Sequence, residues 1–324
     1  MSAAIFAHEH HEALLRPTAR MEVAGTPEGM DAVLLCDLAR SSGATLTHVA
    51  RDEARMSQLT EQIGFFAPEI QVLRFPAWDC LPYDRVSPRM DVMMQRLETL
   101  FRLRESNESA PRILLTTVNA VTQRLIPRAA IRGAGKRIRV GDTIGMEDIS
   151  DFCIKNGYAR VDVVAEPGEF ARRGGILDIF PAAASEPMRL DFFGDTLESL
   201  RGFDPGSQRS SAEEKEILLL PASEALLDEE SISRFRSGYV ARFGAASGED
   251  SLYQAISRAT RFRGMEHWLP LFFDKLESLF DHLPEGAWLS FDHGCESARA
   301  RRLEAIEEYH AERTRHIGET SFGA

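Results

Sequence analysis

The sequence predicts an α/β fold in which parallel sheets are covered by helices, with a small α+β domain inserted between two α/β parts. Helix-like and strand-like segments alternate over residues 22–127, the pattern of a parallel sheet with helices on both faces. Strand and turn signals dominate from residue 158, and a mixed pattern returns after residue 211. At 324 residues the chain is also too long for a single core. The expected parts are a disordered tail at 1–20, an α/β domain at 21–127, the inserted domain at 128–211, and a second α/β domain with the start of a connector at 212–324.

Each element of the first α/β part has its own signal. Apolar residues recur with a helical period over 29–40, and a β-like run follows at 45–50. Asp52 is a favourable N-cap residue, which predicts a helix to about residue 63. The remaining expected elements are a strand at 70–74, a helix from Ser87-Pro88 to about 104, a buried strand at 112–117 and a short helix at 118–125.

Turn-forming residues mark the inserted part. A helix is expected over 146–156, with Gly157 as its stop. The run Arg173-Gly174-Gly175 precedes an apolar strand at 176–180, and the paired glycines predict either a bulge or a close approach of the backbone.

The run Met-Arg-Leu-Asp-Phe-Phe at 188–193 has the alternation of a half-buried strand, because successive side chains of a strand point to opposite faces. The two sets are Leu190 and Phe192 on the core side and Arg189, Asp191 and Phe193 on the solvated side. Gly194-Asp195 then predicts a hairpin turn, with the returning strand over about 197–203.

An exposed aromatic side chain flanked by arginines is typical of protein-binding hot spots. Arg173, Arg189 and Phe193 are therefore candidate partner-binding residues. The alternative is an ordinary small sheet whose two arginines are solvated charges, since single exposed apolar residues are common.

The third part returns to mixed α/β character. Its expected elements are a strand at 217–220, helices at 231–242 and 248–261, a strand at 287–291, and a charged helix from 295 to about 315. Opposite charges are mixed along this last helix, which is typical of a solvated connector. The residues after it form no closing element, so we expect a piece of a longer protein.

Composition excludes several classes of protein. The net charge of −12 argues against a general electrostatic grip on DNA. The four cysteines form no CxxC pair, so neither a zinc site nor a disulfide framework is expected, and no other metal site is expected. The sequence contains neither a signal peptide nor a membrane-spanning run, and we expect a cytoplasmic protein. No set of residues typical of a catalytic site stands out.

The segment Ala24 to Asp31 reads AGTPEGMD where a phosphate-binding loop would read GxxxxGK[ST]. Only Gly29 is in place; Ala24 replaces the first glycine and Met30 replaces the lysine that would contact the phosphates. Asp31 replaces the hydroxyl that would hold magnesium, and its carboxylate would repel phosphate. We therefore expect no binding or hydrolysis of ATP here, and a plain strand–helix turn is the simpler interpretation.

Several long segments, in this order, carry a resemblance to a known family. They are FPAWDCLPYD at 75–84, Ser87-Pro88, Gln95-Arg96-Leu97, TTVNA at 116–120, GEF at 168–170, RGGILDIFP at 173–181, RLDFF at 189–193, and Phe203-Asp204 through Ser207-Gln208-Arg209. The sequence resembles the amino-terminal region of bacterial transcription-repair coupling factors from about residue 20 to 290. It is more distantly similar to the excision-repair protein UvrB.

The resemblance implies a UvrB-like module, with helicase-like parallel-sheet domains (1a and 1b) and an inserted domain (2). It implies a non-catalytic module that recruits UvrA to RNA polymerase stalled at a DNA lesion, within a full-length ATP-dependent DNA translocase. Carried over to this sequence, the UvrA contacts fall on Arg173, Arg189 and Phe193. No cofactor is expected here; ATP, magnesium, RNA polymerase and double-stranded DNA would be bound by domains absent from this chain.

Two other functions are also considered. The first is an ATP-dependent, DNA-damage-processing enzyme of the UvrB type. Met30 and Asp31 argue against it, as does the short segment between Pro82-Tyr83-Asp84 and Ser87-Pro88, which has no room for the DNA-clamping hairpin of UvrB. The second is a module that chiefly restrains the motor of the full-length protein.

Overall fold

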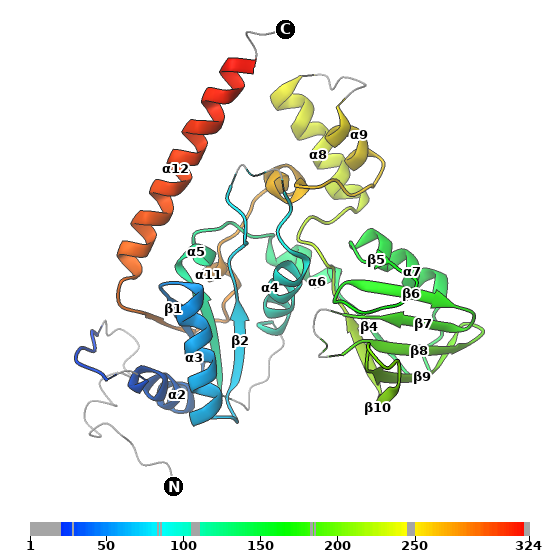
Figure 1. The fold of residues 1–324 in the computed structure, drawn as a ribbon, viewed down its shortest axis with the longest axis horizontal. Coiled ribbons are helices and arrows are strands. Elements are labelled where there is room, and N and C mark those ends of the chain that lie inside the picture. The colour runs from blue at the N-terminus through cyan, green and yellow to red at the C-terminus, as the bar shows by residue number, and fades with distance from the viewer. Residues whose placement is uncertain are drawn as a thin grey trace. The chain divides into compact units, whose positions relative to one another are not determined.

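The computed structural model describes residues 21–320 apart from 28, 83, 85, 105–110, 182, 183, 185 and 245–249, and Figure 1 shows its elements. The tail predicted at 1–20 lies outside the described residues. The chain divides into two compact units. The first unit contains residues up to 77, 102–123 and 278–308, and the second contains 78–101, 124–277 and residues from 309. Each unit is thus built from segments far apart in sequence, and the boundaries 21–127, 128–211 and 212–324 stay a prediction.

A four-stranded parallel sheet in the order β12-β1-β3-β2 is the centre of the first unit. Its elements are α2 (Met30–Ser42), β1 (Thr45–Ala50), α3 (Glu53–Phe66), β2 (Gln71–Phe75), β3 (Arg112–Thr117), α5 (Val118–Val121), α11 (Leu279–His282), β12 (Trp288–Phe291) and the start of α12 (Cys295–Thr320). The parallel α/β prediction is confirmed. β12 comes from the third part of the sequence and pairs with β1, which comes from the first.

Helices α2 and α3 pack against one face of this sheet (Figure 1). Leu46 and Ile113 are directly opposite each other on β1 and β3 and lie in one apolar cluster with residues of both helices, such as Leu35 and Leu59. Asp52 caps α3 as predicted, because its carboxylate accepts a hydrogen bond from the Arg55 backbone N–H at 2.8 Å.

The second unit contains a six-stranded sheet in the order β10-β9-β8-β7-β6-β5 and a two-stranded sheet of β11 and β4. The sheet elements are β4 (Lys136–Arg139), β5 (Ala159–Arg160), β6 (Glu169–Arg173), β7 (Ile176–Ile179), β8 (Met188–Phe193), β9 (Thr196–Phe203), β10 (Ser210–Glu214) and β11 (Glu216–Leu219). The helices are α4 (Met90–Arg102), α6 (Arg128–Ala134), α7 (Met146–Lys155), α8 (Glu229–Phe243), α9 (Ser251–Ser257), η1 (Met265–Trp268) and α10 (Leu269–Phe272). The hairpin predicted at Gly194-Asp195 joins β8 to β9.

A buried ion pair fixes α4 within the second unit. Arg96 Nε lies 2.5 Å from Glu224 Oε1, and both side chains are fully buried. The indole N–H of Trp78 donates to the same carboxylate oxygen at 2.9 Å. Because a buried charge is tolerated only with a partner, this contact ties α4 to the segment that follows β11.

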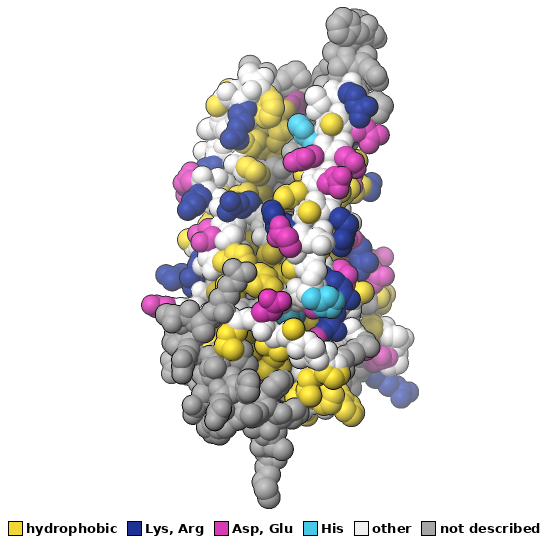
Figure 2. Space-filling view, turned by 90° about the vertical axis from the view of Figure 1, so that its left-hand side faces the viewer, with side chains coloured by type: hydrophobic (Ala, Val, Ile, Leu, Met, Phe, Trp, Pro, Cys, Tyr) yellow, Lys and Arg dark blue, Asp and Glu magenta, His cyan; other side chains and the backbone are white. Residues whose placement is uncertain are grey.

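Helix α12 carries the mixed charges predicted for a solvated connector, and Figure 2 shows acidic and basic side chains interspersed along it. Glu296 and Arg299 form an exposed ion pair of 2.7 Å near its start. Such exposed pairs add little stability.

The stability of the first unit should depend on pH through His48 of β1. This side chain is 5% exposed, and its Nδ1 lies 2.8 Å from Ser290 Oγ of β12. Burial lowers the pKa of His48 from 6.5 to about 4, so the unfolded chain binds the extra proton more readily than the folded chain. The contribution of neutral His48 to the stability of the folded state is therefore complete above about pH 6.5 and is lost as the pH falls toward 4. Near pH 5 we expect a loss of about 2 kcal/mol of unfolding free energy relative to pH 7.

Urea unfolding of the wild type and of His48→Gln at both pH values checks this expectation. The variant should lose about 2 kcal/mol less than the wild type between the two pH values, because only the His48 contribution differs. An equal loss in both proteins would contradict it.

Candidate protein-docking face

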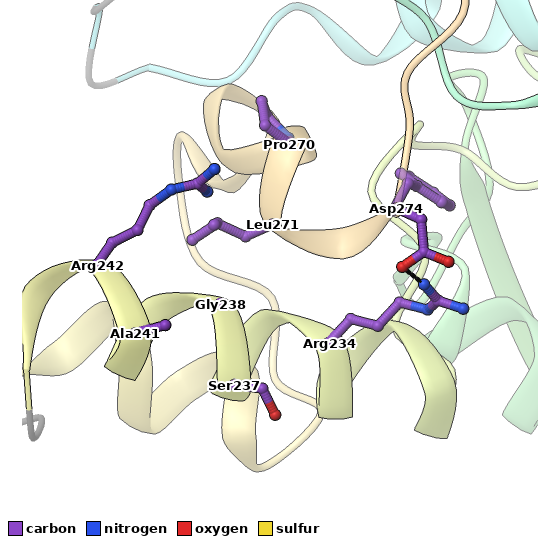
Figure 3. Close-up of a pocket in the computed structure, with 9 residues that line it drawn as sticks. Arg234, Ser237, Gly238, Ala241, Arg242, Pro270, Leu271 and Asp274 are labelled. Atoms are coloured by element: carbon purple, nitrogen blue, oxygen red, sulfur yellow. Dashed lines mark ion pairs between the residues drawn. The ribbon is translucent and has the colours of Figure 1, made fainter.

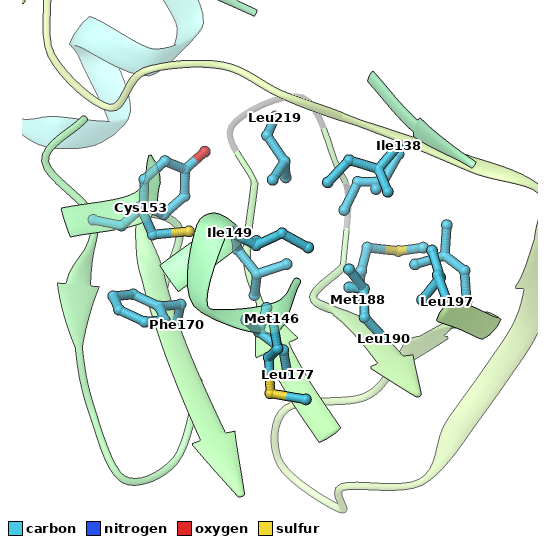
Figure 4. Close-up of a cluster of buried hydrophobic side chains, with 14 of the residues drawn as sticks. Ile138, Met146, Ile149, Cys153, Phe170, Leu177, Met188, Leu190, Leu197 and Leu219 are labelled. Carbon is cyan, nitrogen blue, oxygen red and sulfur yellow. The ribbon is translucent and has the colours of Figure 1, made fainter. Parts of the chain in front are cut away.

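One face of the six-stranded sheet is buried, and this decides which side chains the other face presents. Apolar residues of the sheet, of α7 and of the β4–β11 pair form a single cluster on the buried side (Figure 4). Ile149 and Cys153 of α7 and Leu190 and Leu197 of the sheet are all 0% exposed there. Because side chains alternate along a strand, the sequence neighbours of these sheet residues point to the opposite, outer face.

Strand β8 presents an aromatic ring on the outer face. Leu190 is buried and Phe192 packs against the same core cluster, so Arg189, Asp191 and Phe193 point outward, as the alternation predicted. The pairing of β8 with β9 shifts register between Asp191 and Phe192, yet the alternation along β8 is kept. Phe193 is 77% exposed, so its ring is open to solvent on this face.

The β6–β7 hairpin places a second exposed group on the same face as β8's outward side chains. Arg173 lies directly opposite Ile176, and Ile176 lies opposite Asp191, so the three side chains share the outer face. Arg173 is exposed, and its guanidinium donates a hydrogen bond to the backbone carbonyl of Asp162. Ile176 is 36% exposed and adds apolar surface to this face.

The glycine pair between β6 and β7 forms a tight turn, and of the two predicted alternatives the structure shows a close backbone approach. Gly174 has a left-handed φ of 58°. A Cβ on Gly175 would lie 3.0 Å from the carbonyl oxygen of Phe192. The Gly175 carbonyl itself accepts a hydrogen bond from the Phe192 N–H at 2.8 Å.

Arg189 is less open than the alternation predicted. Its Nε and Nη2 donate to the two carboxylate oxygens of Asp178, at 2.7 and 2.8 Å, from the directly opposite position on β7. The guanidinium carbon also lies 4.6 Å from the ring centroid of Phe203. As a result the Arg189 side chain is only 21% exposed. The Asp178 carboxylate raises the pKa of Arg189 above its ordinary value, which keeps the guanidinium charged.

The outer face thus contains all three candidate residues. Arg173 and Phe193 are exposed there, whereas Arg189 is paired with Asp178. Their contact with a partner stays a prediction. The sequence did not identify Ile176 or Asp178 as part of this face. A carboxylate in the apolar run 176–180 was the available signal for Asp178, since a charge there requires a partner on a neighbouring strand.

The segment from Ala24 to Asp31, predicted to be a degenerate phosphate-binding loop, leads into α2. Gly29 is the N-cap residue, with φ 84° and no side-chain cap. Asp31, in the first turn, forms an ion pair with Arg55, whose side chain is 6% exposed. Arg55 Nε also lies 3.4 Å from Asp292 Oδ2. The cationic group beside the start of α2 is therefore already neutralised by two carboxylates of the chain itself. Met30 is the first residue of the helix, and Ala24 precedes it in an exposed loop.

A pocket of about 400 Å³ lies between α8 and α10 (Figure 3). It is lined by Arg234, Ser237, Gly238, Ala241, Arg242, Pro270, Leu271, Phe273 and Asp274. Arg234 and Asp274 form an ion pair on one side, and Leu271 lies nearer the other side, where Arg242 extends. Ser237 is the one hydroxyl in this lining, and Asp274, its one carboxylate, is paired with Arg234.

Within the described part of the chain, no group of three or more His, Cys, Asp or Glu residues is arranged to hold a metal ion. The four cysteines are free thiols. Burial raises the pKa of Cys36 and Cys80 to about 11 and that of Cys153 to about 12, so these thiols stay protonated near neutral pH. Among the described residues, no helix has the length and hydropathy needed to cross a membrane.

Comparison with known proteins gives two findings. Residues 137–224, which include all three candidate residues, match the UvrB interaction domain family. The chain is also similar to the transcription-repair-coupling factor of Escherichia coli (strain K12), with 34% identity over 80% of this chain and 22% of that protein. The protein of the same name from Haemophilus influenzae is 34% identical over 79% of this chain and 22% of its own length. The one from Myxococcus xanthus is 33% identical over 91% and 26%. The chain therefore spans about a quarter of the length of these relatives.

The exposure of Phe193 can be tested against a buried neighbour on the same strand. Phe193→Ala should change the free energy of unfolding by less than about 0.5 kcal/mol, because the ring has little to lose on truncation. Leu190→Ala should cost about 2–5 kcal/mol, because Leu190 is 0% exposed. Urea unfolding measures both, and equal losses would show that the strand faces are assigned wrongly.

Proposed function

The chain is homologous to the transcription-repair-coupling factors and carries a UvrB interaction domain at residues 137–224, and we propose that it is a non-catalytic module that recruits UvrA. UvrA would dock on the outer face of the six-stranded sheet. We further propose that this recruitment brings excision repair to RNA polymerase stalled at a DNA lesion. The recruitment of UvrA would take place in the cytoplasm.

The observation that carries the proposal is the exposed ring of Phe193 on the same sheet face as the exposed Arg173, within the matched domain. An apolar anchor of this kind gains binding energy when it fills a pocket of a partner, and arginine is enriched beside such anchors. Arg189 adds guanidinium N–H donors that Asp178 and Phe203 hold in one geometry, so little side-chain freedom is lost on binding.

The full-length protein would carry the motor. We propose that the remainder of the protein, which corresponds to about three quarters of its relatives, binds ATP and magnesium, RNA polymerase and double-stranded DNA and acts as a DNA translocase. In the chain described here, Asp31 and Asp292 neutralise Arg55, and Met30 provides no positive charge for a nucleotide. These contacts support a module without nucleotide chemistry and argue against the UvrB-type enzyme.

Removing the outer-face groups should weaken UvrA binding. Phe193→Ala, Arg173→Ala and Arg189→Ala should each reduce the affinity by about 1–4 kcal/mol if the residue is an interface anchor, as measured by titration calorimetry with purified UvrA. Phe65→Ala is a matched control for the aromatic ring, since Phe65 is 81% exposed in the first unit. Arg236→Ala on α8 is the matched control for the arginines. Undiminished affinity in the triple Arg173, Arg189 and Phe193 variant would refute the proposed docking face.

Titration with a fluorescent ATP analogue in the presence of magnesium tests the absence of nucleotide chemistry. We expect no saturable signal, because the Asp31 carboxylate already pairs with the guanidinium of Arg55, which could otherwise attract a phosphate. Saturable binding, competed by unlabelled ATP, would instead support the UvrB-type enzyme.

A further inference from the structure

The segment that follows β9 folds back beside Arg189. The N–H of Asp204 donates to the carbonyl of Arg209 at 2.9 Å, and the N–H of Gln208 donates to the carbonyl of Asp204 at 2.8 Å. The Asp204 carboxylate accepts a further hydrogen bond from the Ser207 N–H at 2.7 Å. These bonds close residues 204–209 into a compact loop. Residues of this loop are among the segments that carry the family resemblance, but the docking face proposed above does not include them.

Gln208 connects this loop to Arg189. The residue has a left-handed φ of 60°, a conformation that a non-glycine residue keeps only where its surroundings hold it. Its Nε2 donates to the Pro205 carbonyl at 2.8 Å, which turns the amide oxygen toward the guanidinium. Arg189 Nη2 lies 3.3 Å from that oxygen, and Nη1 lies 3.5 Å from the Gln208 backbone carbonyl.

Arg189 is therefore clamped from two sides. Asp178 takes the Nε–Nη2 edge, which is the edge that pairs with a carboxylate in two parallel hydrogen bonds. Gln208 takes a second Nη2 contact and approaches Nη1, while the Phe203 ring lies against the planar group. A guanidinium has five N–H donors, so at least one N–H on Nη1 is left without a partner among the described residues.

We propose that Asp178 and Gln208 are positioning residues for UvrA recognition, which hold the Arg189 guanidinium in its binding geometry before the partner arrives. This inference rests on the proposed function, because it concerns how one docking residue is made ready. The clamp removes the rotational freedom that a long side chain would otherwise lose at the interface. Affinity for UvrA thus depends on Asp178 and Gln208 through Arg189 rather than through contacts of their own.

A double-mutant cycle tests the proposal with the full chain. Affinity for UvrA is measured for the wild type, Asp178→Asn, Arg189→Ala and the double variant. Asp178→Asn should weaken binding about tenfold in the wild-type background and should have no further effect in the Arg189→Ala background. An equal loss in both backgrounds would show a general structural effect, and unchanged or tighter binding would show that Asp178 competes with UvrA for Arg189. Each of these results would overturn the proposal.

Gln208→Asn is a second variant that tests the clamp without disturbing the sheet. Asparagine tolerates the left-handed conformation, but its shorter side chain cannot reach Arg189 in the same way. It should weaken UvrA binding in the wild-type background alone, as Asp178→Asn does.

A measurement on the free chain tests the clamp on Arg189 independently of UvrA binding. Exchange of the Arg189 Nε–H proton with water, followed by NMR on the free chain, should be slow in the wild type and faster in Asp178→Asn. Unchanged exchange would overturn the clamp even if UvrA binds as proposed. Loss of affinity in none of the Arg173, Arg189 and Phe193 variants would instead overturn the docking function itself, and the positioning role with it.

Discussion

The burial of one face of the six-stranded sheet is the constraint on which the candidate docking face depends. Leu190, Leu197 and Ile149 fill the core beneath the sheet with no exposure to solvent. Since a strand has a period of two, a slip of one residue in β8 would move Leu190 to solvent and Arg189 into the core. The cost of such a slip fixes the register, and the register in turn fixes Phe193 on the outside. The exposure of the Phe193 ring thus follows from the packing of the core beneath the sheet.

The two arginines of the docking face differ in what they can offer a partner. Arg173 is exposed at the end of β6 and has one backbone contact, with Asp162, so its guanidinium retains most of its donors. Arg189 is oriented by Asp178 and stacked on Phe203. One arginine can therefore adapt to a partner, whereas the other contributes a fixed geometry. On such a face, Arg173 can tolerate small differences in the partner's surface, whereas Arg189 makes binding specific for acceptors at one position.

The sequence was most informative where local rules decide the structure. The strands at 45–50 and 112–117, the Asp52 cap and the β8 alternation all follow from period and capping, and the structure has them as predicted. Contacts between distant segments were not predictable in the same way. The pairing of β11 with β4 and the ion pairs Asp178–Arg189 and Arg96–Glu224 join residues that no local pattern relates. The helix expected over 248–261 is shorter, at Ser251–Ser257, and the residues just before Asp250 lie outside the described residues.

The order of strands in the parallel sheet has a consequence for synthesis on the ribosome. Val49 of β1 pairs with Phe291 of β12, so one edge of β1 finds its partner only after the strands of the second unit have been synthesised. At roughly 5–20 residues per second, translation takes on the order of 10 to 50 seconds to pass from one to the other. During that interval the nascent chain carries an unpaired strand edge that can associate with other polypeptides. Residues 124–277 of the second unit emerge in the meantime, so its six-stranded sheet is synthesised in full before the parallel sheet of the first unit is complete.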